Sequence, residues 1–211
     1  KQDIYCQWAT NEKVAAEIAA GASIGGARAL CAMKHVGVNV AADPLFSMGY
    51  TGVNGGFVIV SADDPGCHSS QNEQDNRNYA KFAKIPCIEP KDSAECKDYM
   101  KRAFDISEEY DTPVLLRITT RVCHSKGIVE LEERQEVAIR EYKKDVKKYI
   151  TVPAHAKQLR ANVEERIHNL RKFSNETDMN RIEWNDKKIG VIASGGAIDY
   201  AHEVFGDSAS Y

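Results

Sequence analysis

The sequence lacks the signatures of several common classes of protein. Its 211 residues contain no apolar run near the ~20 residues that a membrane-spanning helix needs. The first residues, KQDI, lack the basic start and apolar core of a signal peptide. The formal net charge of −3 offers no broad basic face to nucleic acid. We therefore expect a cytoplasmic protein that binds neither membrane nor nucleic acid.

Several chemical motifs are also missing. The six cysteines include no C-x-x-C pair, which argues against a zinc ribbon or an iron–sulfur cluster within this chain. The sequence has no P-loop, no G-x-G-x-x-G, no G-x-S-x-G and no H-E-x-x-H motif, and Gly195-Gly196 is a lone glycine turn. A nucleotide site is therefore unsupported, and we expect no metal site in this chain.

The sequence does contain short apolar runs that alternate with helical patterns. Strands are predicted at 28–33, from Val58, at 85–88 and at 114–118, with a further short strand possible at 4–8. Helices are predicted after a cap at Thr10, at 76–84 and from Asp92 or Ser93 to Tyr110. Residues 34–39 are predicted as a loop that leads into a further short helix ending near Met48. This alternation predicts an α/β fold, with a mostly parallel sheet covered by helices on both faces.

The character of the sequence changes near residue 129. Residues 130–148 are highly charged and predict a helix, and a second charged helix carries a narrow apolar stripe from Ala156 to Phe173. A strand, a glycine turn and a helix from about Ala197 then follow. We expect a first domain at 1–129, a charged helical insertion at 130–187 that packs by one face, and the truncated start of a second α/β domain at 188–211.

Polar residues follow three of the predicted strands. The loop 63–75, which follows the strand from Val58, contains several carboxylates and His68. Arg121 and His124 follow strand 114–118, and His35 and Asn39 follow strand 28–33. Because the carboxyl ends of parallel strands open into the ligand crevice, we expect these groups on one edge. The loop carboxylates suit a divalent cation, but their spacing matches no metal motif, and Asx turns explain them better.

Two further residues have both a structural and a functional interpretation. Arg121 could bind a carboxylate or a phosphate, or form a structural salt bridge. Glu12 lies in a first helical turn, where the helix dipole alone would stabilise it by about 0.3–1 kcal/mol.

Five segments carry a resemblance to a known family. They are 11–15 (NEKVA), 33–39 (MKHVGVN), 41–44 (AADP), 63–75 (DDPGCHSSQNEQD) and 119–125 (TTRVCHS), with further matches at 152–156 and 180–184. Together they resemble the α subunits of indolepyruvate:ferredoxin oxidoreductases, which belong to the thiamine-diphosphate-dependent 2-oxoacid:ferredoxin oxidoreductases. The loop 64–75 is the most specific match.

The resemblance implies roles for individual residues. Residues 1–129 would be a pyrimidine-binding domain without its N-terminal part. Glu12 would be the catalytic residue that hydrogen-bonds N1′ of the cofactor's aminopyrimidine, and so promotes removal of the thiazolium C2 proton. Residues Val36, Gly37, Val38 and Asn39 would line the pyrimidine pocket. The substrate side would comprise His35, Asp63, Asp64, His68, Arg121 and His124.

The resemblance also implies a reaction and partners. The full enzyme would decarboxylate an aryl 2-oxoacid oxidatively to an acyl-CoA and pass electrons to ferredoxin, as an oligomer with a β subunit. Mg²⁺ and [4Fe–4S] clusters would be held by other parts of the enzyme, because the G-D-G motif and the cysteine-rich domain are absent from this sequence. Residues 188–211 would begin a transketolase C-terminal-like domain. We expect this chain alone to be inactive.

Three alternatives remain open from the sequence. The first is a pyrimidine-domain module of a non-redox thiamine-dependent 2-oxoacid decarboxylase. The second is a metal-dependent hydrolase that uses the carboxylates of the loop 63–75. The third is a non-catalytic assembly module whose helices at 130–173 bind a partner.

Overall fold

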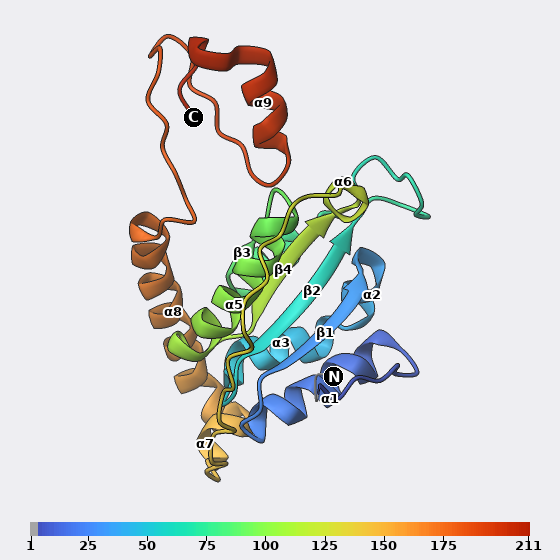
Figure 1. The fold of residues 1–211 in the computed structure, drawn as a ribbon. Helices are drawn as coiled ribbons and strands as arrows, with labels where there is room; N and C mark the ends of the chain where they lie inside the picture. The colour runs from blue at the N-terminus through green and yellow to red at the C-terminus, as the bar shows by residue number, and fades with distance from the viewer. Residues whose placement is uncertain (1–3) are drawn as a thin grey trace.

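The computed structural model describes residues 4–211. Four strands form one parallel sheet in the order β1-β2-β4-β3 (Figure 1). The strands are β1 (Ala29–Lys34), β2 (Phe57–Asp63), β3 (Cys87–Ile88) and β4 (Val114–Thr119). In the register, Lys34 pairs with Ala62 and Asp63 pairs with Thr119. The carboxyl ends of β1, β2 and β4 therefore meet at one edge, called the carboxyl edge below.

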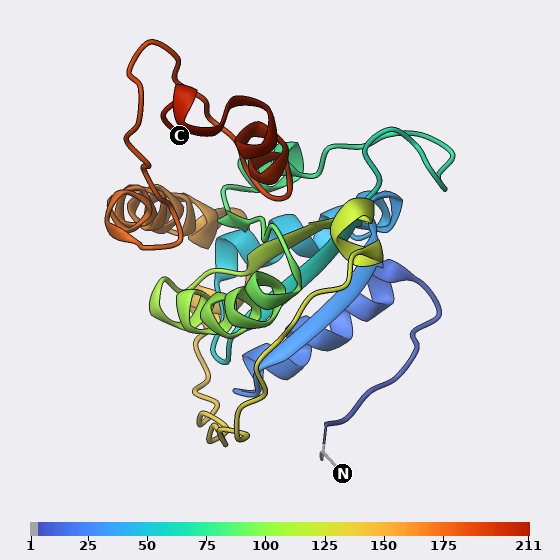
Figure 2. The same ribbon diagram turned by 45° about the horizontal axis from the view of Figure 1, so that its top comes forward.

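Helices cover both faces of this sheet, as Figure 2 also shows. One face packs against α1 (Glu12–Ile24), α3 (Ala42–Thr51) and α4 (Arg77–Ala83) in a core built around Phe57, Ile59, Leu45 and Leu115. The other face packs against α5 (Ser93–Glu109) and α8 (Pro153–Glu176), with Val58, Val114 and Leu116 buried. The predicted fold class is confirmed.

Local sequence signals explain where the main helices begin. Asn11 caps α1, because its side-chain oxygen accepts a hydrogen bond from the Val14 amide at 2.9 Å. The predicted cap, Thr10, is one residue too early. Asp92 caps α5 as predicted, accepting from the Glu95 amide at 2.9 Å. Each capped helix therefore starts directly after a short polar side chain that satisfies a free amide.

Two segments that directly follow strands are helical. His35–Val40 forms α2 and Thr120–His124 forms α6, each starting directly after a strand. The prediction of a loop at 34–39 is therefore wrong. Figure 1 shows both short helices at the arrowhead end of the sheet, beside the loop 64–75.

The predicted helix at 130–148 is also wrong. Only α7 (Val146–Tyr149) is helical there, and residues 126–145 run as irregular chain. The segment is fixed instead by Arg140, whose amide donates to the Gly26 carbonyl at 2.9 Å and whose guanidinium pairs with Glu108 at 2.9 Å. Leu131 is 93% exposed, so the segment has no apolar face through which packing could stabilise a helix.

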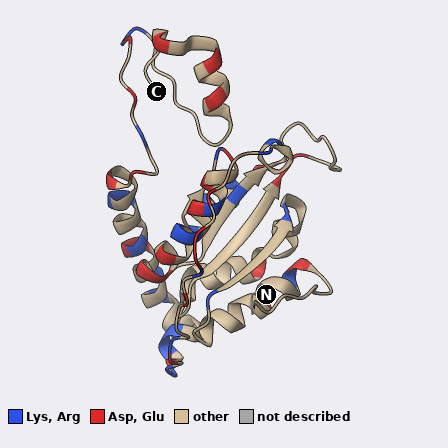
Figure 3. Cartoon of the chain, in the orientation of Figure 1, with Lys and Arg blue, Asp and Glu red and all other residues tan. Residues whose placement is uncertain are grey.

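Helix α8 behaves as its apolar stripe predicts. Leu159, Val163 and Leu170 are buried, while the remaining surface is charged. Figure 3 shows basic and acidic residues side by side along α8, whereas the strands carry few charges. The helix thus packs by one face on α3 and on the core of the sheet.

The C-terminal segment differs in part from its prediction. Helix α9 (Ala197–Phe205) starts where expected, and η1 (Gly206–Ser208) follows it. The expected strands at 188–192 and 4–8 do not form; near the first there is only an isolated bridge between Gly190 and Ser210. Within residues 4–211, no helix has the length and apolar character to cross a membrane.

Candidate active site

Glu12 opens α1, and its side chain lies against Gly37 of α2. A Cβ atom on Gly37 would fall 2.6 Å from Glu12 Cγ and 3.0 Å from Oε1, so only glycine permits this approach. Glu12 is half-buried, and no side chain or backbone group of residues 4–211 hydrogen-bonds or ion-pairs with its carboxylate. The site therefore presents a shielded acceptor that has a defined place and no donor from the described chain.

The other predicted pocket residues point in different directions. Val38 is buried in the core at 1% exposure, and Val36 is half-buried. Asn39 is exposed, and its side-chain oxygen accepts a hydrogen bond from the Tyr79 hydroxyl. Gly37 lies against Glu12, and contact of any of the four with a pyrimidine stays a prediction.

His35 connects α2 to the polar loop. It is fully buried, and its Nε2 lies 3.0 Å from the Asn72 carbonyl oxygen. Because a carbonyl can only accept, Nε2 carries a hydrogen, and the buried Nδ1 has no hydrogen-bond partner among residues 4–211. The His35 carbonyl accepts from the Asn76 amide side chain at 3.1 Å. These bonds hold the start of α2 against the end of the loop.

Asp63 ends β2 inside a buried ion-pair network. Its Oδ2 lies 2.6 Å from Nε of Arg117, and its Oδ1 accepts from the Ser61 hydroxyl at 2.6 Å. Arg117 is 4% exposed and also pairs with Glu89. The amide of Asn76 donates to Asp63 Oδ2 at 3.0 Å. Both oxygens of Asp63 are therefore occupied, and contact of this carboxylate with substrate stays a prediction.

Asp64 organises the loop that follows. Its carboxylate accepts from the Ser70 hydroxyl at 2.6 Å, from the Ser69 amide at 2.7 Å and from the Thr120 hydroxyl at 2.7 Å. These bonds, with that of Ser70 the largest, hold the pKa of Asp64 well below its usual range. Glu73 likewise accepts from the Gly66 amide at 2.8 Å. The loop acids therefore shape the loop.

A metal centre gains no support from this arrangement. Across the described chain, no three His, Cys, Asp or Glu side chains are grouped so that they could hold an ion. Each loop carboxylate is instead bonded to nearby hydroxyl, amide or guanidinium groups. The expected Asx turn does not form at Asp64, because the Gly66 amide donates to Glu73, but Asp75 accepts from the Arg77 amide two residues on at 3.1 Å. The metal-dependent hydrolase is therefore not favoured.

The remaining substrate-side candidates lie at the exposed rim of the carboxyl edge. His68 is exposed, and its ring lies over Gly66. Arg121 and His124 are exposed on α6. The Arg121 guanidinium lies 5.2 Å from the centre of the Tyr200 ring on α9, so it faces the C-terminal segment. Their contact with a substrate stays a prediction.

Sequence reasoning missed several residues that build this edge. Arg117 and Glu89 are absent from the predicted set, although a charged residue inside the apolar run VLLRIT is a signal of a buried ion pair. Glu89 also accepts from the Ser194 hydroxyl at 2.7 Å, and Lys91 pairs with Asp199 at 3.3 Å. The C-terminal segment therefore docks on the carboxyl edge.

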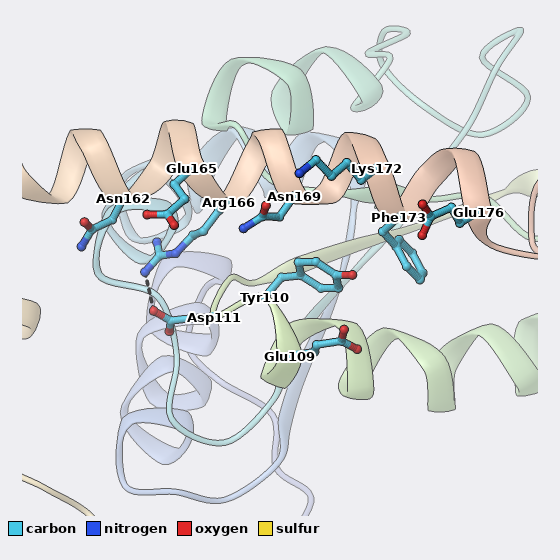
Figure 4. Close-up of a pocket in the computed structure, with 10 residues that line it drawn as sticks. All are labelled: Glu109, Tyr110, Asp111, Asn162, Glu165, Arg166, Asn169, Lys172, Phe173 and Glu176. Carbon is cyan, nitrogen blue, oxygen red and sulfur yellow. Dashed lines mark hydrogen bonds and ion pairs between the residues drawn. The ribbon is translucent and has the colours of Figure 1, made fainter.

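A large cavity lies away from this site. It measures about 520 Å³ and lies between the end of α5 and helix α8, and Figure 4 shows the residues that line it. Arg166 crosses it to Asp111, with Nη2 2.5 Å from Oδ2. Asp111 also accepts from the Val53 amide and from Lys148. These bonds anchor α7 and α8 at the opposite end of the sheet from the carboxyl edge.

Comparison with known proteins identifies the family of this chain. Residues 1–189 match the family described as pyruvate flavodoxin/ferredoxin oxidoreductase, thiamine diphosphate-binding. The chain belongs to this family. Family membership indicates a thiamine diphosphate-binding domain.

Two named relatives are similar to this chain over most of its length. The chain is 47% identical over 205 residues to indolepyruvate oxidoreductase subunit IorA of Archaeoglobus fulgidus, covering 96% of this chain and 33% of the relative. It is 46% identical over 210 residues to the IorA subunit of Thermococcus kodakarensis, covering 96% and 32%. The chain therefore spans about a third of the length of these family members.

A solved structure shares the fold. It is the 2-oxoglutarate:ferredoxin oxidoreductase from Magnetococcus marinus with 2-oxoglutarate, coenzyme A and succinyl-CoA bound. It superposes with a TM-score of 0.68 at 12% identity, covering 96% of this chain and 44% of that chain. At this identity the comparison establishes the architecture of the sheet and helices.

Proposed function

We propose that this chain is the pyrimidine-binding part of an enzyme that oxidatively decarboxylates aryl 2-oxoacids of the indolepyruvate type. The full enzyme would form acyl-CoA and reduce ferredoxin in the cytoplasm. It would be an oligomer with a β subunit, with Mg²⁺ and [4Fe–4S] clusters held outside residues 1–211. Family membership and the IorA-named relatives support this proposal.

We also propose the division of the chain that the sequence suggests. Residues 1–129 would be the pyrimidine-binding domain, 130–187 a charged helical insertion or linker, and 188–211 part of a transketolase C-terminal-like domain. The whole sheet and helices α1 to α6 lie within the first part, which supports the first boundary, while α8 of the second part packs onto one face of the sheet. The burial of Leu159 and Val163 of α8 against that domain disfavours a free assembly module.

The observation that carries the function is the half-buried, partnerless Glu12 carboxylate lying on Gly37. An aminopyrimidine needs one carboxylate that accepts its N1′ hydrogen bond within a shielded site. Glu12 offers that acceptor, and the glycine leaves the carboxylate accessible beside α2. The residues present therefore fit the cofactor's aminopyrimidine.

The mechanism divides between cofactor and protein. When bound, thiamine diphosphate supplies a carbon nucleophile that adds to the 2-oxo carbon and holds the electron pair after CO₂ leaves. Glu12 holds the proton shared with N1′ and so assists removal of the reactive carbon's proton. Gly37 allows that carboxylate to lie close against α2. His35 Nε2 bonds to the Asn72 carbonyl and so holds α2 against the polar loop.

Glu12→Gln in the full-length complex tests the proposal. Loss of a general acid–base group predicts a fall of about 10²–10⁴ in turnover, and a matching fall in hydrogen–deuterium exchange at C2 of the bound cofactor. Glu17→Gln, on the exposed side of the same helix, serves as the control. Unchanged turnover and exchange in Glu12→Gln would leave Glu12 as a helix-start residue only.

A second assay separates the redox enzyme from its non-redox alternative. The full-length wild type should reduce a viologen dye when given indolepyruvate and CoA, because two electrons remain after decarboxylation. A non-redox decarboxylase would release aldehyde and leave the dye oxidised. The 211-residue chain by itself should do neither.

A further inference from the structure

We propose that Lys34 anchors the carboxylate of the 2-oxoacid substrate; this inference rests on the proposed function. Lys34 is the last residue of β1 and stands at the carboxyl edge, paired in register with Ala62. It directly precedes the buried His35 and is three residues before Gly37, which touches Glu12. Its position therefore lies between the polar loop and the candidate cofactor site.

Lys34 is oriented by the protein, yet its charge is not neutralised. Its Nζ donates to the Ser69 carbonyl at 2.5 Å, and within residues 4–211 no carboxylate lies within ion-pair distance of it. An ammonium carries three N–H donors, so two remain after the bond to Ser69. Lys34 is half-buried. The result is a fixed cation that still has donors for an anion.

The neighbouring cations of this edge are committed elsewhere. Arg117 pairs with Asp63 and Glu89, and Arg77 pairs with Asp75 at 2.7 Å. The acids cannot neutralise Lys34 either, because Asp63 and Asp64 bond to other partners. Arg121 has no carboxylate partner in the described chain, but its guanidinium faces the Tyr200 ring. Lys34 is thus the cation nearest in sequence to Gly37 that keeps an unmatched charge.

The chemistry of the site favours a single carboxylate as the anion. A diphosphate is usually held by several amide groups of a helix N-terminus or glycine-rich turn, or by a metal ion. At Lys34 the structure offers one ammonium beside the occupied Ser69 carbonyl. One ammonium with two remaining donors matches one carboxylate. Under the proposed reaction, that group belongs to the 2-oxoacid.

This assignment predicts an unusual kinetic signature. The substrate carboxylate leaves as neutral CO₂, so its attraction to Lys34 weakens as the reaction proceeds. An interaction that is stronger in the ground state than in the transition state lowers KM without raising kcat. Removing the charge should therefore raise KM for the oxoacid while kcat stays constant or rises.

The experiment compares Lys34→Gln, Lys34→Arg and the control Lys81→Gln in the full-length complex. Lys81 is an exposed lysine of α4, with no ion pair in the described chain. Lys34→Gln should raise KM for the oxoacid about tenfold, which is the loss of one charge-assisted bond. Lys34→Arg should recover part of the affinity, and Lys81→Gln should match wild type. The melting temperature and the Kd for thiamine diphosphate should not change.

Two other outcomes would overturn the assignment. A raised Kd for thiamine diphosphate, or a raised KM for CoA alone, would show that Lys34 serves a phosphate group. A fall in kcat at constant KM would show that it acts on the chemical step.

An equilibrium measurement separates this inference from the proposed function. The wild-type complex should bind indole-3-propionate more tightly than its neutral amide, and Lys34→Gln should abolish that preference. If the wild type turns over no 2-oxoacid, the proposed function fails, but the carboxylate preference still decides the role of Lys34. A preference that persists in Lys34→Gln would refute the anchor.

Discussion

The side chain of Glu12 lies so close to Gly37 that a single added methyl group on the glycine would overlap it. The hypothetical Cβ falls 2.6 Å from Glu12 Cγ and 3.1 Å from Cδ. The two residues belong to different helices, α1 and α2, and are 25 positions apart in the sequence. The glycine therefore acts as a positioning residue for the carboxylate.

Gly37→Ala should displace the Glu12 carboxylate and slow turnover about 10²-fold, because a shift of about 1 Å in a catalytic group has that effect. Gly21→Ala on α1 is the matched control, since a Cβ at Gly21 has nothing within 4 Å. That control should keep full activity and a melting temperature equal to or above wild type. Turnover and thermal unfolding of both variants check the prediction, which fails if Gly37→Ala is as active as Gly21→Ala.

Arg117→Met should destabilise the chain more than any surface change nearby. It would leave Asp63 without a charge partner and Glu89 with Arg77 alone, 3.9 Å away, at a site where Arg117 is 4% exposed. Breaking a buried pair in this way costs about 3–5 kcal/mol of unfolding free energy. Urea unfolding measures the loss, with Arg134→Met, an exposed arginine of the irregular segment, as control. A loss below about 1 kcal/mol would mean that water already reaches the network.

The loop 64–75 should stay ordered to a lower pH than a turn held by an aspartate of ordinary pKa. Hydrogen bonds from Ser70, Ser69 and Thr120 lower the folded-state pKa of Asp64. A lowered folded-state pKa stabilises the protein above the unfolded-state pKa of about 3.9, and this contribution is lost as pH falls through the folded-state value. Stability conferred by Asp64 should therefore be full at pH 7 and decline below about pH 4.

Comparing wild type with Asp64→Asn measures this contribution. The difference in unfolding free energy should be constant from pH 7 to about pH 5 and should shrink as the solution becomes more acidic. Asp207→Asn, at an exposed carboxylate of η1, should lack this pattern. A difference that grows on acidification would contradict the direction of the pKa shift.

Much of the fold follows from local patterns in the sequence. The apolar runs at Val58 and Val114 predict buried strands, and both are central in the sheet. The parallel arrangement then places the polar loop and Thr119 at one edge, as the register confirms. These predictions succeed because burial and strand direction depend on short stretches of chain.

The predictions fail where the structure depends on packing between segments that are distant in sequence. The charged residues at 130–145 resemble a solvated helix, but without a buried stripe no packing stabilises one. The Arg117–Glu89 pair and the approach of Glu12 to Gly37 join residues that are distant in sequence, so no local pattern reveals them. Glu12 entered the candidate set through family resemblance, and the contact with Gly37 required coordinates.

Strand β1 lies at one side of the sheet, and no strand of residues 4–211 pairs with its outer backbone. Leu30 on this strand is 49% exposed. Free amide and carbonyl groups beside an apolar side chain form a template for strand addition from another molecule. When purified alone at high concentration, the 211-residue chain should therefore self-associate through β1. Covering the unpaired backbone edge of β1 should keep the chain monodisperse.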